Sequence, residues 1–162
     1  MRSDISPTTG EIYYSGHWQE LVEILRVLNI GEGKLAKVTE ETTNHYQEMV
    51  DRDIDAILES LYQVPLRAMN QIQPDGSLKR VFPGDIRRAA KYWVCALMLL
   101  SEFQTLSQNV TDQAQAFVDD SKKEIYAIVR WNHRIPGQER KSSISRTMPP
   151  NMQPNYIPEP NF

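Results

Sequence analysis

The sequence predicts an all-α protein: a small four-helix bundle-like domain at residues 17–137, with an N-terminal arm (residues 1–16) and a long extended C-terminal tail (residues 138–162). Three observations support this prediction. Four segments repeat apolar residues at helical steps of three and four. Glycine or proline stands where several of these segments end, as it does at many helix termini. Each segment has a single apolar face, so packing the helices together buries all of these faces.

The composition of the chain limits the possible classes of protein. Its 162 residues, 40% of them hydrophobic, suit one domain with a modest core. The net charge of -3 gives no overall basic field for nucleic acid. We expect no signal peptide and no membrane partner, because residues 1–10 are polar and the longest apolar run, residues 93–100, is too short to span a bilayer. The single cysteine, Cys95, indicates a reducing compartment and a buried core position.

The first two predicted helices have clear ends. Residues 17–30 form the first helix, and the glycines of the G-E-G sequence at 31–33 end it. The second helix begins near Thr39, a favourable N-cap followed by acidic residues, and continues until Pro65 stops it. Its apolar face consists of Tyr46, Val50, Ile54, Ile57 and Leu61.

The second half of the chain contains the other two helices and the tail. A connection with a Pro-Asp-Gly turn and a short extended piece at residues 78–82 precedes the third helix, residues 84–106. This helix is the most hydrophobic and should lie at the centre. The fourth helix starts near Thr111, and the Pro-Gly pair at 136–137 ends any helix there. Five of the ten prolines lie in residues 138–162, which we expect to be extended and unable to form a core.

Acidic side chains dominate the polar face of the second helix. Residues 39–64 contain seven acidic residues and one basic residue. On a helical wheel, the face opposite the apolar one includes Glu41, Glu48, Asp51, Asp55 and Glu59. Three interpretations stay open: a solvated surface, an electrostatic surface within an assembly, and a catalytic or metal-binding carboxylate pair.

Basic residues follow this acidic helix. Residues 65–91 contain six basic and two acidic residues. The candidates for an ionic contact are Lys79, Arg80, Arg87, Arg88 and Lys91. They could pair with the acidic face of the same chain or of the next copy. The second arrangement is head-to-tail and builds a ring if the rotation closes.

Sequence motifs for catalysis, metal binding and cofactor binding are missing. We find neither the G-x-S-x-G motif nor a phosphate-binding loop, and the three histidines lie in separate segments. Cys95 has no second cysteine at zinc-ligand spacing. We therefore expect no enzymatic activity, no metal and no cofactor. Residues 130–148 combine basic side chains with Trp131, which is only a weak pattern for binding single strands.

Residues 54–66 match the spacing I-D-x-x-L-x-x-x-Y-x-x-P-L. The matching residues are Ile54, Asp55, Leu58, Tyr62, Pro65 and Leu66. This pattern, with the order of the four helices, resembles the head–tail connector proteins of tailed bacteriophages, also called adaptor or head-completion proteins. The resemblance covers residues 17–137. One position departs from it, because many members have arginine immediately before the tyrosine and this chain has Leu61.

The resemblance implies a structural virion protein of the neck, assembled in the host cytoplasm, that is not an enzyme. Connectors form a ring, usually of twelve copies, below the portal protein. The ring extends the channel through which genomic DNA passes without sequence-specific binding, and it supports the next neck or tail protein. The acidic residues of the second helix would then line the channel or contact a neighbouring subunit.

The resemblance also suggests that the C-terminal tail docks on the portal. The candidate docking residues are Arg140, Lys141, Ile144, Arg146, Tyr156, Ile157 and Phe162. An alternative function is a helical protein-binding module that presents its proline-rich tail as a ligand for an aromatic-lined groove. A third interpretation, a small carboxylate enzyme or metal protein, predicts a bound ion or a pH-dependent activity.

Overall fold

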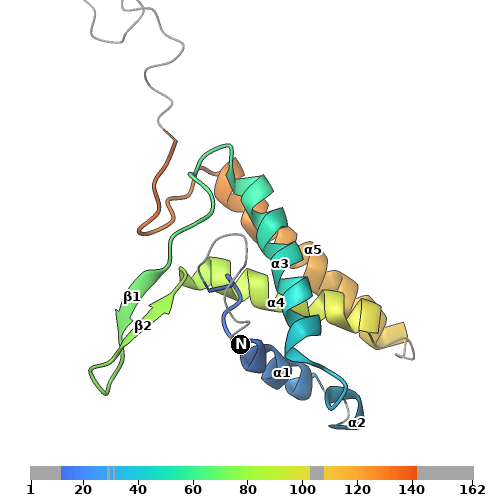
Figure 1. Ribbon diagram of the computed structural model, residues 1–162. Helices are drawn as coiled ribbons and strands as arrows, with labels where there is room; N and C mark the ends of the chain where they lie inside the picture. Colours follow the sequence, from blue (N-terminus) through green and yellow to red (C-terminus); the bar gives the residue numbers. More distant parts are fainter. Residues whose placement is uncertain (1–11, 29, 31, 103–107, 142–162) are drawn as a thin grey trace, which may run out of the picture.

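A computed structural model describes residues 12–28, 30, 32–102 and 108–141 (Figure 1). This part of the chain is mostly helical, as predicted, and has one two-stranded β-hairpin. The elements are α1 (Trp18–Val27), α2 (Glu32–Leu35), α3 (Glu40–Leu58), β1 (Met69–Ile72), β2 (Leu78–Val81), α4 (Gly84–Glu102) and α5 (Gln108–Arg130).

Helix α4 lies at the centre of the fold, and α1, α3 and α5 each pack against it (Figure 1). Its buried residues are Ile86, Ala89, Ala90, Trp93, Val94, Cys95, Ala96, Met98 and Leu99. This confirms the prediction that the most hydrophobic helix is central, and it confirms Cys95 as a core residue. The apolar stripe is broad because three helices cover α4 from different sides.

The predicted helix starts agree better with the structure than the predicted helix ends. Thr39 caps α3 as expected, and its hydroxyl accepts a hydrogen bond from the Thr42 backbone N–H at 3.1 Å. However, α3 ends at Leu58 rather than near Pro65, and the chain after it pairs with a remote segment, where the Gln63 N–H donates to the Glu139 carbonyl at 2.9 Å. Gly33, expected to end the first helix, lies within the short helix α2.

The extended piece predicted at residues 78–82 is β2, and its antiparallel partner β1 was not predicted. Met69 pairs with Val81 at the base of the hairpin, and Ile72 pairs with Leu78 near its tip. Gly76 has a φ of 83° in the turn, where a residue with a β-carbon would be strained. Figure 1 shows the hairpin projecting away from the helices.

Residues 12–16 are not a loose arm, which corrects the prediction for the described part of residues 1–16. The exposed fractions of Tyr13, Tyr14 and Ser15 are 3%, 2% and 0%. This segment packs against α3 because its backbone groups and the hydroxyls of Tyr14 and Ser15 find hydrogen-bond partners there. The rest of the predicted arm, residues 1–11, lies outside the described residues, as does the tail from residue 142 onward.

Candidate assembly interface

The residues of the connector-like motif come together around the end of α3. Ile54, Leu58, Tyr62 and Leu66 have exposed fractions of at most 1%, whereas Asp55 is half-buried. Pro65 is exposed and follows Val64 through a cis peptide bond. The spacing of the motif therefore corresponds to one buried side of α3 and of the turn after it.

Tyr62 joins this turn to the loop after α5. Its hydroxyl donates a hydrogen bond to the His133 carbonyl at 2.6 Å and accepts one from the Ile135 N–H at 2.8 Å. The Arg140 guanidinium lies over the Tyr62 ring, 5.5 Å from the ring centroid, and donates to the Asn132 carbonyl at 2.8 Å. A buried tyrosine needs such partners for its hydroxyl, so Tyr62 fixes the position of the chain after α5.

Tyr14 makes the equivalent connection for the segment before α1. Its hydroxyl donates to the Asp55 carboxylate and accepts from the Leu66 N–H at 2.8 Å. Its ring meets the edge of Phe82 at a centroid distance of 4.7 Å. The residue that holds Asp55 in the described structure is thus a tyrosine far away in sequence. An arginine at the position of Leu61 is not needed for this contact.

Two carboxylates lie beneath residues 12–16. The Asp51 carboxylate accepts the backbone N–H of Tyr14 at 3.2 Å and is 5% exposed. Burial raises the pKa of Asp51 well above its usual range, and burial raises the pKa of Asp55 to about 6. Asp51 is desolvated and Asp55 is partly so, as acid–base chemistry would require. Asp51 is nevertheless covered by Tyr14, so the arrangement suits an anchor for this segment better than a site open to substrate.

The predicted acidic face of the second helix is not one continuous surface. Glu41 and Glu59 are exposed, Glu48 and Asp55 are half-buried, and Asp51 is buried. Residues 12–16 cover the middle of this face, a coverage that a helical wheel cannot reveal. The interpretation as a solvent-exposed channel wall or subunit contact is therefore wrong for Asp51. It stays a prediction for Glu41 and Glu59, the exposed residues at the two ends of the face.

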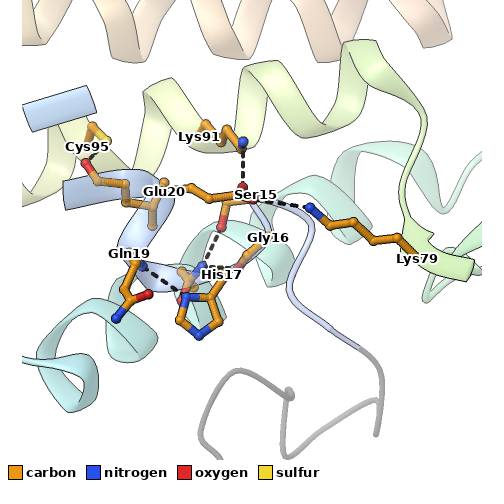
Figure 2. A network of polar contacts seen from close by, with 10 residues as sticks. Ser15, Gly16, His17, Gln19, Glu20, Lys79, Lys91 and Cys95 are labelled. Atoms are coloured by element: carbon orange, nitrogen blue, oxygen red, sulfur yellow. Dashed lines mark hydrogen bonds and ion pairs between the residues drawn. The ribbon is translucent and has the colours of Figure 1, made fainter. Parts of the chain in front are cut away.

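The predicted basic patch does contribute ion pairs within the chain, but α3 does not provide their partners. The Glu20 carboxylate of α1 pairs with Lys91 of α4 at 2.7 Å and with Lys79 of β2 at 3.5 Å. Figure 2 shows Glu20 between the two lysines. Burial alone would raise the pKa of Glu20, but the hydrogen bond and charge of Lys91 hold it below its usual value. Arg88 pairs with Glu124 of α5 at 3.4 Å. These contacts connect α1, β2 and α5 to α4.

The remaining basic residues lie near a cavity of about 400 Å³ between residues 12–17 and β2. Arg80 donates to the Ala68 carbonyl at 3.5 Å, and Arg87 lines the cavity beside the rings of Tyr14 and Phe82. Arg80 and Arg87 share this cavity, whereas Arg88 lies in a different groove between α4 and α5. The five predicted basic residues therefore do not form one patch.

The described part of the predicted docking tail belongs to the domain. Arg140 contacts Tyr62, and the Lys141 N–H donates to the Leu61 carbonyl at 2.9 Å. Arg140 is thus already engaged by its own chain, although the Lys141 side chain is exposed. The other predicted docking residues, Ile144, Arg146, Tyr156, Ile157 and Phe162, lie outside the described residues.

Sequence reasoning missed Tyr14 and Glu20 as organising residues. The signal for Tyr14 was the apolar run Ile12–Tyr14 just before Gly16, which is unusual for a solvated arm.

In the part of the chain that the structure describes, no cluster of three or more metal-ligating side chains is present, and no helix is long and apolar enough to cross a membrane. No family model matches the chain, and no curated protein or solved structure matches it significantly.

Proposed function

We propose that this chain is a head–tail connector, a structural subunit that assembles below a phage portal and extends the DNA channel. The observation that supports this most is the arrangement of the motif residues. These residues hold the end of α3 to both flanking segments. Asp55 and Leu66 bond Tyr14 before α1, and Tyr62 bonds the loop after α5.

The packing of the domain also suits a subunit that must contact several proteins. Helices α1, α3 and α5 pack on α4, while the hairpin projects from this body (Figure 1). The chain leaves the domain from a defined place, because residues 139–141 pair with the turn after α3 through the Gln63 N–H and the Leu61 carbonyl. A tail that leaves the domain at a fixed place can bind a portal subunit that lies at a defined distance from the domain.

The proposal is tested by co-sedimentation with a purified portal ring from the same genome, with bound copies counted by mass. We expect about one copy of this chain for each portal subunit. Bovine serum albumin, mixed at the same concentration, controls for trapped protein. Absence of binding to a portal shown to be intact would contradict the proposal.

A second variant tests the proposed role of the tail. Deleting residues 142–162 leaves every described contact in place, so the truncated chain should fold normally. We expect it to lose portal binding, because Ile144, Arg146, Tyr156, Ile157 and Phe162 are removed. Portal binding at full strength would show that the tail does not dock there, while leaving the connector proposal intact.

A further inference from the structure

An apolar pair lies near the tip of the hairpin. Ile72 and Leu78 are cross-strand partners, and their exposed fractions are 74% and 66%. Residues directly opposite each other in an antiparallel pair project from the same face, so the two side chains form one apolar knob. Exposed aliphatic pairs at the end of a projecting element are typical of contacts with another protein.

The opposite face of the hairpin is held against the domain. Met69 and Val81 are half-buried, and the Met69 side chain contacts the loop at Gly137. Lys79, on the same face, pairs with Glu20 of α1. These contacts on one face fix the orientation of the hairpin. The apolar knob of Ile72 and Leu78 is therefore presented in a defined direction, and Leu78 also borders the cavity beside β2.

A groove between α4 and α5 has matching chemistry. The rings of Tyr92 and Phe117 lie with their centroids 5.4 Å apart, and Tyr92 is 38% exposed. Ala89 and Ser121 form the buried floor of this groove, whose volume is about 200 Å³. A cavity of roughly 150 Å³ holds a benzene-sized group, so the groove has room for a Leu or Ile side chain.

We propose that the Ile72–Leu78 knob of one copy inserts into the Tyr92–Phe117 groove of the next copy. The charges around the two surfaces are complementary. Arg80 lies on the same face of β2 as Leu78, whereas the exposed carboxylate of Asp120 lies at the rim of the groove. The contact buries apolar groups on both sides and places opposite charges at its edge, as stable interfaces do.

The proposed contact is head-to-tail, because the knob and the groove are different surfaces of the chain. Such contacts repeat from copy to copy and close into a ring when the rotation between copies allows it. The contact between copies follows from the two surfaces themselves. Only the expectation that the copies form a ring on the portal rests on the proposed connector function. The proposed contact does not depend on the acidic residues of α3.

Single-cysteine substitutions test the contact. Ile72→Cys and Tyr92→Cys chains are mixed and oxidised mildly, both free at high concentration and bound to portal rings. The native Cys95 is fully buried and should not form a disulfide. We expect a disulfide-linked dimer in the mixture and none from either variant alone. Val27→Cys, at a 78% exposed position on α1, replaces Ile72→Cys in the matched control.

The outcomes separate the inference from the connector proposal. Cross-linking several-fold above the Val27→Cys control, and lost when Leu78→Asp is added to the Ile72→Cys chain, would support the inference. Cross-linking no higher than the control, both free and on portal rings that bind the chain, would overturn it while the connector proposal stands. A dimer formed by Ile72→Cys alone would also overturn it, because the contact would then be symmetric. Portal binding, measured on the same samples, decides the connector proposal independently.

Discussion

Replacing Tyr62 by phenylalanine removes one buried hydroxyl and leaves the ring in place. That hydroxyl bonds the Ile135 N–H and the His133 carbonyl, and Ile135 is only 4% exposed. A buried N–H left without a partner costs about 1–3 kcal/mol, and the lost bond to the carbonyl costs about 1 kcal/mol more. We therefore expect Tyr62→Phe to lower the free energy of unfolding by about 2–4 kcal/mol.

Urea denaturation followed by circular dichroism measures this change. A domain of this size has a denaturant slope of about 1–2 kcal/mol per molar urea, so the midpoint should fall by about 1–4 M. The loss is a large share of the 5–15 kcal/mol that typically stabilises a domain, yet the variant should still fold.

Tyr126 provides a matched control for the same chemical change. It lies on α5 with 56% of its surface exposed, so Tyr126→Phe should change stability by less than about 0.5 kcal/mol. If Tyr62→Phe were as stable as Tyr126→Phe, the motif tyrosine would not be the hydrogen-bonding junction described above, and the structural reason for its place in the motif would fail.

Three further predictions concern other parts of the domain. Burial raises the pKa of Asp55 to about 6, so the folded chain binds more protons than the unfolded chain between about pH 4 and 6. Its contribution to stability must fall as the pH rises through this window, and Asp55→Asn should flatten that part of a series of urea midpoints by about 1–2 kcal/mol. Gly137 has a φ of 71°, and a β-carbon there would meet the Met69 sulfur at 2.6 Å. Gly137→Ala should therefore lower the free energy of unfolding by about 1–2 kcal/mol, which is seen as a lower melting temperature. Cys95 is fully buried and burial raises its pKa to about 12, so a thiol reagent should label it only after denaturant is added.

Each of these three predictions has an outcome that would contradict it. An unchanged pH profile in Asp55→Asn would mean that Asp55 titrates as an ordinary surface carboxylate. The control for Gly137→Ala is Gly33→Ala, where a β-carbon meets open space and stability should be unchanged or slightly higher. Equal effects at the two glycines would refute the proposed clash. Rapid labelling of Cys95 in buffer would show that α4 is not the closed centre of the core.

Local patterns predicted the long helices well because their signals are local. The Thr39 cap and the apolar periodicity of α4 depend on residues a few positions apart. The end of α3 was predicted poorly because its cause is remote. The Gln63 N–H pairs with the Glu139 carbonyl, and no spacing rule connects residues that far apart in sequence. β1 was missed because the residues Met69–Ile72 show no strand-like alternation.

The candidate site shows the same limit more sharply. A helical wheel correctly placed Glu48, Asp51 and Asp55 on one side of α3, but it could not show that Tyr14 lies over the two aspartates. Tyr14 precedes α1 and has no periodic pattern around it. The wheel therefore described the direction of the carboxylates correctly, and the inference that they face solvent failed.

This limit changes how assembly should be tested. Reversing Glu48, Asp51 and Asp55 to lysine looks like a natural test of a ring contact, but it would place a cation at the buried position of Asp51 and another against the Tyr14 hydroxyl that Asp55 accepts. Loss of assembly in that variant would report unfolding, because an unpaired buried charge is strongly destabilising. Ile72 and Leu78 are exposed in the folded chain, so substitutions there leave the core intact. Loss of rings in those variants would therefore report the contact between copies.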